Sequence, residues 1–139
     1  MNSNVDPHPS FRFAVEIDGI EEAGFSEVSS INIQTEVEEQ KEGGVNNFVY
    51  KLPKQTKYDD IKLKRGMTNS SVLYDWYMDV VKGKITLRDV AIVLYDIKRE
   101  EVRRWSFQKA FPVKWTGSDL NATSNNLYFE SVDLAHSGF

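Results

Sequence analysis

The amino-acid sequence predicts a mainly β protein: an antiparallel β-barrel or β-sandwich with a single flanking helix. Several segments alternate apolar and polar residues with the period of two that marks a strand with one exposed face. Only one segment shows the period of a helix. The chain has 139 residues, which favours one domain. We place this domain at residues 11–139, behind a flexible N-terminal arm at residues 1–10 that is polar and carries two prolines.

Composition argues against several classes of protein. The chain has no cysteine, which rules out a disulfide framework and fits assembly in a reducing cytoplasm. The first ten residues lack the charged and apolar regions of a secretory signal. No segment approaches the roughly 18 apolar residues of a membrane span, so we expect no membrane anchor. The net charge of −4 argues against a protein that coats nucleic acid.

The N-terminal half predicts two half-buried strands. The first spans residues 11–17, and the second runs from Ile31 to Glu38. One face of the second strand is wholly polar, and the other is the better core face because its side chains are apolar or β-branched. The apolar face holds Ile31, Ile33, Thr35 and Val37, and the polar face holds Asn32, Gln34, Glu36 and Glu38.

A loop follows the second strand. Gly43 and Gly44 mark residues 40–47 as a loop or hairpin tip. Residues 48–52 predict a short strand, which Pro53 ends because proline cannot donate a hydrogen bond to a strand ladder.

The helix is predicted from Asn69 to Lys82. Apolar side chains recur there at the spacing that places them on one face, toward the core. They are Leu73, Trp76, Tyr77, Val80 and Val81. Asn69 or Ser70 is the expected N-cap, and Gly83 stands where a helix commonly ends in a left-handed residue.

The strand over residues 90–95 is predicted to be buried on both faces, since it is continuously apolar and rich in β-branched residues. The remaining expected segments are a polar connection at residues 54–58 and strands at 61–65, 102–107, 113–116 and 127–135.

No combination of residues predicts catalysis. His8 and His136 stand near opposite ends of the chain, and we interpret both as ordinary surface residues. The acidic dipeptides do not form catalytic pairs, because neighbours on a strand point to opposite faces. The three tryptophans are in patterned segments, which favours packing over a sugar platform. We therefore predict no enzyme, no metal site and no cofactor.

The order and spacing of short motifs resemble the tail tube proteins of contractile phages and the inner tube proteins of phage-tail-like contractile injection systems. The motifs are Lys51-Leu52-Pro53, Lys57-Tyr58, Ile61, Leu63-Lys64-Arg65-Gly66, Leu73, Trp76, Arg88-Asp89-Val90, Arg104-Trp105, Phe107, Ala110, Pro112, Leu120-Asn121-Ala122, Glu130 and Leu134-Ala135-His136. Two departures concern local turns. Ser118 replaces an expected proline, and residues 97–100 lack an expected glycine.

The resemblance implies a structural subunit with a tail-tube-like fold. Such proteins form hexameric rings that stack into a rigid tube, inside a contractile sheath and between baseplate or tube-initiator and terminator proteins. DNA or protein cargo passes through the lumen without specific binding. The resemblance implies assembly in the cytoplasm, as part of a virion tail or a released injection particle. The sequence leaves the phage and the cell-derived device open as alternatives.

In such a ring we expect the polar face of the second strand, Asn32, Gln34, Glu36 and Glu38, to line the lumen. We expect the loop region to contact other subunits or stacked rings, because its apolar residues would otherwise be exposed. Its candidate residues are Gly43, Gly44, Val45, Phe48, Tyr50 and Leu52. The alternative function is a monomeric β-sandwich recognition module that binds a carbohydrate or a receptor.

Overall fold

The computed structural model describes residues 11–41, 49–123 and 127–139, and it confirms a mainly β fold with one helix in those residues. The elements are β1 (Arg12–Ile17), β2 (Ile20–Glu22), β3 (Phe25–Ser29), β4 (Ile33–Lys41), β5 (Val49–Tyr58), β6 (Ile61–Gly66), α1 (Val72–Val81), β7 (Arg88–Tyr95), β8 (Glu101–Gly117) and β9 (Phe129–Ala135). The predicted N-terminal arm lies outside the described residues.

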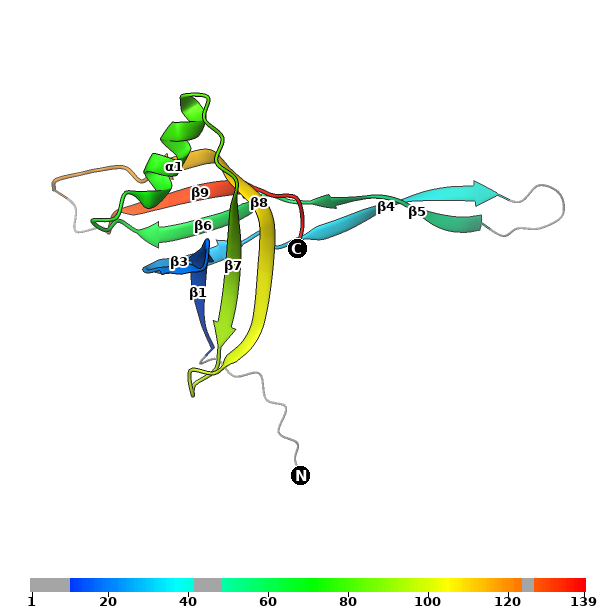
Figure 1. The fold of residues 1–139 in the computed structure, drawn as a ribbon, viewed down its shortest axis with the longest axis horizontal. Coiled ribbons are helices and arrows are strands. Elements are labelled where there is room, and N and C mark those ends of the chain that lie inside the picture. The colour runs from blue at the N-terminus through cyan, green and yellow to red at the C-terminus, as the bar shows by residue number, and fades with distance from the viewer. Residues whose placement is uncertain (1–10, 42–48, 124–126) are drawn as a thin grey trace.

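Seven strands form one antiparallel sheet in the order β2-β1-β7-β8-β9-β6-β3. The strand β8 belongs to both halves of this sheet: its first part pairs with β7 and its last part pairs with β9. Figure 1 shows β8 curving from one half into the other. The result is an open sandwich with a shared strand. It is not a closed barrel, because β2 and β3 each end the sheet.

Within the described residues, strands β4 and β5 pair only with each other, and they extend away from the rest of the molecule (Figure 1). We call this pair the projecting hairpin and the remaining elements the body. The hairpin corrects the prediction for residues 49–58. Pro53 does not end a strand but pairs with Val37 inside β5, and residues 54–58 are strand rather than connection. A two-stranded hairpin leaves one edge of each strand free, so it tolerates a proline.

The strands predicted at residues 102–107 and 113–116 are one continuous strand, β8, of 17 residues, which bends between them. Val90 pairs with Phe107 and Arg88 with Ala110, so β8 holds one extra residue at this point. Lys109 there adopts the left-handed conformation, with φ of 54°. Such a bulge bends a strand and increases its twist. The bend brings the two halves of the sheet around one core.

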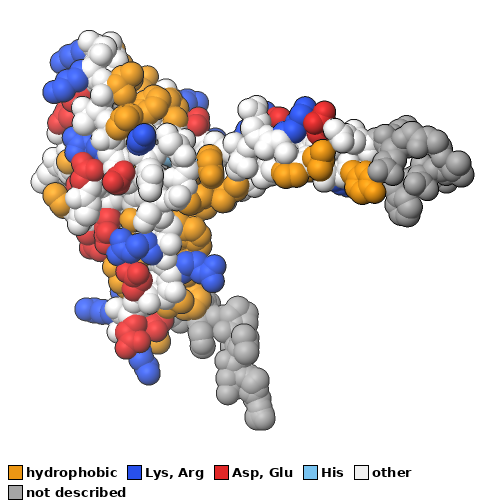
Figure 2. Space-filling model, turned by 45° about the vertical axis from the view of Figure 1, so that its right-hand side comes forward, with side chains coloured by type: hydrophobic (Ala, Val, Ile, Leu, Met, Phe, Trp, Pro, Cys, Tyr) orange, Lys and Arg blue, Asp and Glu red, His pale blue; other side chains and the backbone are white. Residues whose placement is uncertain are grey.

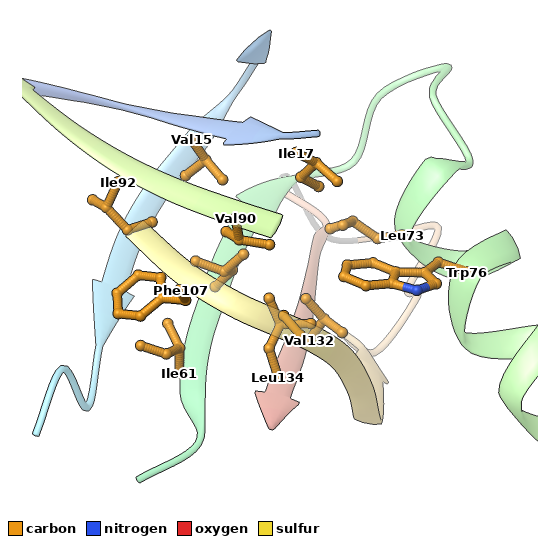
Figure 3. Packing of buried hydrophobic residues seen from close by; sticks show 12 residues of the cluster. Val15, Ile17, Ile61, Leu73, Trp76, Val90, Ile92, Phe107, Val132 and Leu134 are labelled. Carbon is orange, nitrogen blue, oxygen red and sulfur yellow. The ribbon is translucent and has the colours of Figure 1, made fainter. Parts of the chain in front are cut away.

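Side chains from both halves of the sheet and from α1 meet in a single core (Figure 3). The strand β7 is buried on both faces from Val90 to Val93, as predicted, whereas Leu94 and Tyr95 at the end of the predicted range are half-buried. In α1, Leu73 and Trp76 are buried, and the Trp76 indole N–H donates to the Thr86 carbonyl at 2.8 Å. The other predicted helix residues are less covered: Tyr77 and Val80 are half-buried, and Val81 is 60% exposed.

The ends of α1 differ in how well the sequence predicts them. The N-cap is Ser71, not Asn69 or Ser70, and its hydroxyl donates to the Asp75 carboxylate at 2.7 Å rather than accepting from the backbone. At the other end, Gly83 has a φ of +89° and its N–H donates to Val80. The next N–H, of Lys84, donates to the Asp79 carbonyl. These two bonds form a Schellman motif, which confirms the predicted stop at Gly83.

Candidate assembly surfaces

The projecting hairpin exposes apolar side chains that its own subunit does not cover. Ile33 is 56% exposed and Val37 is 54% exposed. Val49, Tyr50, Leu52 and Tyr58 on the opposite strand are also exposed. The prediction that Ile33, Thr35 and Val37 face the core of the subunit is therefore wrong. Only Ile31, which precedes β4, packs against the core. Apolar surface of this kind marks an interaction site.

Strand pairing defines two sides of the hairpin. The first side, which we call the apolar side, carries Ile33, Thr35 and Val37 opposite Tyr58, Thr56 and Pro53. The hydroxyl groups of Thr35 and Thr56 are hydrogen-bonded across it at 3.1 Å. This side combines β-branched and ring side chains, which suits contact with another protein surface.

The second side, which we call the acidic side, carries Gln34, Glu36 and Glu38. Glu36 forms an ion pair with Lys57 at 2.7 Å, and the hydrogen bond and charge of Glu36 raise the pKa of Lys57. The pair cancels part of the negative charge predicted for this side. Asn32 stands at the hairpin root, where its amide donates to the Asp59 carboxylate at 3.0 Å.

The predicted contact loop is described only in part. Tyr50 and Leu52 lie in β5 and pair with Gln40 and Glu38. Both are exposed on the acidic side of the hairpin. The other predicted contact residues, Gly43, Gly44, Val45 and Phe48, lie outside the described residues.

A groove lies where the hairpin leaves the body. Its volume is about 590 Å³, and we call it the corner groove. It is lined by Ile31, Ile33, Arg104, Trp105, Ser106 and Phe139. Figure 2 shows hydrophobic side chains gathered in this corner and along one side of the hairpin. Because Ile33 belongs both to the groove and to the apolar side, the two form one continuous surface.

Unpaired strand edges border the body. The strands β2 and β3 end the sheet. Within the described residues, the part of β8 from Glu101 to Phe107 pairs only with β7, since the β9 ladder begins at Phe111. This free part of β8 carries Trp105, which lines the corner groove. Free strand edges beside an apolar groove favour pairing with another chain.

Two charge clusters were not predicted from the sequence. On the surface, Arg104 contacts Glu16 and Glu101, each at 2.8 Å. The hydrogen bond from Arg104 lowers the pKa of Glu101, and the two carboxylates raise the pKa of Arg104. The pair with Glu16 joins β8 to β1, which is distant in the sequence, whereas Glu101 precedes Arg104 by three residues in β8 itself.

The second cluster is buried around Arg65, which is 1% exposed. Its guanidinium lies 3.4 Å from Glu22 and 3.6 Å from Glu130. Glu130 also accepts from the indole N–H of Trp115 at 3.2 Å. The cluster ties β6, β9 and β8 to the residues around β2, so we interpret it as a structural network.

The described residues show no arrangement for metal chemistry, because none of their His, Asp and Glu side chains form a group of three that could hold a metal ion. His8 lies outside the described residues. His136 is half-buried and packs among aromatic rings, so it is not the simple surface residue that the sequence predicted. In the described part of the chain, no helix is long and apolar enough to cross a membrane.

Comparison with solved structures finds the same fold in contractile injection systems. A chain in the sheath–tube complex of an extracellular contractile injection system, PVC, in its extended state matches with a TM-score of 0.82 and 26% identity. The match covers 94% of this chain and 88% of that one. A chain of the PVC sheath/tube terminator structure matches with a TM-score of 0.84 and 26% identity, over 96% of each chain.

A chain of the anti-feeding prophage baseplate matches with a TM-score of 0.74 and 26% identity, over 99% of this chain and 94% of that one. Hcp1 from Flavobacterium johnsoniae, at 14% identity and a TM-score of 0.54 over 89% of each chain, shares the fold alone. No curated protein sequence matches the chain significantly. The family model for the T4-like virus tail tube protein gp19 matches residues 9–139. The chain therefore belongs to this tail tube family, as its motifs predicted.

Proposed function

We propose that this protein is the structural subunit of an inner tube, in which hexameric rings stack into a rigid conduit for DNA or protein cargo. The observation that carries the proposal is the projecting hairpin of a tail tube family member, whose apolar side chains stay exposed in the single subunit. Assembly would remove this apolar surface from water, and this is the main driving force of most protein association. The proposal assigns no catalysis and no cofactor to the protein.

The neighbouring copy in a ring would cover the corner groove and the apolar side of the hairpin. Such a contact joins two different surfaces of the subunit, and a contact of this type closes into a ring when the rotation allows it. The free part of β8 supplies unpaired backbone groups beside the groove, and the acidic strand β2 supplies another free edge. Pairing between such edges would extend the sheet from copy to copy.

The solved relatives support the partners that we propose. One relative is part of a sheath–tube complex, another of a sheath/tube terminator, and a third of a baseplate symmetrised sixfold. By analogy, we propose that this subunit contacts itself, a contractile sheath, baseplate or initiator proteins and a terminator. We place assembly in the cytoplasm and the finished tube in an extracellular injection particle or a virion tail, with cargo passing through the lumen without specific binding.

Two sets of hairpin residues keep their proposed roles, and the described members of both lie along the acidic side, so this side would line the lumen and also meet another subunit or the next ring. The acidic side, with Asn32 at its root and Gln34, Glu36 and Glu38 along β4, would face the lumen. Tyr50 and Leu52, together with Gly43, Gly44, Val45 and Phe48, would contact another subunit or the next ring. Both assignments leave the apolar side of the hairpin for the neighbouring copy in the ring, since its side chains are exposed in the single subunit.

The experiment that tests the proposal is negative-stain microscopy of the purified protein, combined with its molar mass in solution. We expect rings of six copies and tubes built from stacked rings. A protein that stays monomeric at all concentrations, and whose unfolding temperature rises with an added carbohydrate or receptor fragment, would instead support the recognition module.

A further inference from the structure

Residues 136–139, which follow β9, lie at the root of the projecting hairpin and contact both the hairpin and the body. The His136 ring centre is 5.0 Å from that of Phe107 in β8 and 5.5 Å from that of Tyr58, the last residue of β5. The Phe139 ring lies 4.8 Å from Phe107 and 5.7 Å from Tyr58. The segment therefore places two rings between the end of the hairpin and the core.

Backbone hydrogen bonds fix this segment to β8 at its bend. The N–H of Ser137 donates to the Gln108 carbonyl, and the N–H of Gln108 donates to the Gly138 carbonyl, both at 2.9 Å. The two bonds join Gln108 to adjacent residues of the segment, so two residues there oppose one residue of β8, as in a β-bulge. The rings of His136 and Phe139 are thus carried by backbone that is part of the body.

His136 also ties down the residue that follows the hairpin. Its Nδ1 accepts from the N–H of Gly138 at 3.1 Å, so the ring proton is on Nε2. The Nε2–H then donates to the carbonyl of Asp59 at 3.1 Å. Both ring nitrogens are used, and together they hold the orientation of the imidazole between segment 136–139 and the hairpin root.

Gly138 is required at its position for two separate reasons. Its φ of +120° is a conformation that other residues rarely adopt. A Cβ atom at this position would lie 2.9 Å from the ring of Tyr58. The backbone of residue 138 therefore packs directly against the hairpin root, with no room for a side chain.

We propose that Tyr58, His136, Gly138 and Phe139 form a clasp that sets the direction of the projecting hairpin relative to the body. A two-stranded hairpin has little stability of its own, and within the described residues no strand of the body pairs with β4 or β5. Phe139 also lines the corner groove, so the clasp forms part of the surface that a neighbour would cover. This inference rests on the proposed ring assembly, for which the hairpin must point toward the next copy.

The direction of the hairpin is measurable in the single subunit. The chain contains no cysteine, so spin labels attach only at introduced sites. Lys51→Cys places one label on β5, and Lys98→Cys places the other on the turn between β7 and β8, both at exposed positions. Pulsed electron paramagnetic resonance on dilute protein then gives the distribution of distances between hairpin and body.

The test variant is Gly138→Ala, and its matched control is Gly83→Ala. Both glycines have positive φ, but a Cβ at Gly83 meets no atom within 4 Å. The two variants therefore share backbone strain and differ in the contact with the hairpin. We expect Gly138→Ala to broaden or shift the distance distribution and to reduce the fraction of protein in tubes. We expect Gly83→Ala to leave the distance distribution unchanged.

A second variant, Tyr58→Ala, removes the ring from the hairpin side, while Tyr58→Phe keeps it. We expect the alanine variant to broaden the distribution and the phenylalanine variant to match the unmodified protein. An unchanged distribution in both Gly138→Ala and Tyr58→Ala would overturn the clasp. A broadened distribution with normal tube formation would overturn its role in assembly. If the unmodified protein forms no rings, the proposed function fails, and the distance measurement still decides whether the clasp holds the hairpin.

Discussion

The guanidinium of Arg65 lies 3.6 Å from the carboxylate of Glu130, and both side chains are shielded from water inside the body. Glu22 adds a second carboxylate at 3.4 Å, and the carbonyl groups of Ala23 and Ser70 accept from the same guanidinium. Burying charges is costly unless they are paired and hydrogen-bonded. Arg65 and Glu130 therefore each need the other as a counter-charge inside the body.

Replacing Glu130 with alanine should destabilise the subunit by about 3–5 kcal/mol, because it leaves the buried Arg65 short of a counter-charge. It also leaves the indole N–H of Trp115 without its acceptor. The free energy of unfolding in denaturant is the measurement. The control is Glu101→Ala, which removes an exposed partner of Arg104 and should change stability little, because solvent screens surface ion pairs. Equal losses in the two variants would contradict the structural role of the buried pair.

Trp76→Ala should cost about 3–5 kcal/mol, because the indole is 2% exposed and fills the space between α1 and the sheet. The variant also leaves the Thr86 carbonyl without its donor. Thermal and denaturant unfolding of the soluble fraction provide the measurement. The control on the same helix is Val81→Ala, which is exposed and should change stability little. A soluble Trp76→Ala variant of unchanged stability would place this residue outside the core.

The body of the fold was the part that sequence patterns predicted best. The helix around Trp76 and the strand around Val93 have local periodicity, since each buries side chains against a fixed neighbour. Gly83 was identified because only a glycine readily takes the left-handed position at a helix end. The bend of β8 was not predicted, because Lys109 gives no signal for its positive φ.

The hairpin was predicted less well for a physical reason. Residues 54–58 are exposed on both sides of β5, so no buried face imposes alternation on their sequence. The same exposure misled the prediction for Ile33 and Val37, because apolar alternation indicates a covered face without saying which chain covers it. The ion pairs of Arg65, and the pair of Arg104 with Glu16, join distant segments, and a single sequence carries no record of such contacts.

Val37→Asp should prevent assembly without unfolding the subunit. Val37 stands on the apolar side of the hairpin and is exposed in the single copy, so a charge there costs little until a neighbour removes it from water. Sedimentation of tubes and the unfolding temperature of the subunit are the two measurements. The matched control is Gln34→Asp, which adds the same charge on the acidic side of the same strand. Tubes of normal yield from Val37→Asp would remove the apolar side from the interface.

The surface pair of Arg104 and Glu101 predicts a change in acid titration. Arg104 lowers the pKa of Glu101, so this contribution to stability is present above the pKa of the unfolded chain. It is lost as the pH falls through the lower pKa of the folded state. In Arg104→Gln, the carboxyl signal of Glu101 in an NMR titration should therefore move to higher pH. An unchanged titration would show that the contact does not persist in solution.

The last prediction tests whether the acidic side of the hairpin lines the channel. In a ring, each carboxylate is repeated around the channel, and the resulting negative field would keep a DNA backbone from adhering during ejection. The Glu36→Lys, Glu38→Lys double mutant should still form tubes, because the changes leave the apolar side intact. It also places a new cation beside Lys57, which loses its partner.

The expected result is slowed passage of DNA or acidic cargo at low salt, relieved by added salt that screens the new attraction. The control is Glu36→Gln, Glu38→Gln, which removes the negative charge without adding attraction and should slow passage much less. Normal passage of cargo through tubes of the lysine variant at low salt would exclude these residues from the channel wall. Loss of sheath attachment in the same variant would instead place the acidic side on the outside of the tube, where its carboxylates would face the sheath.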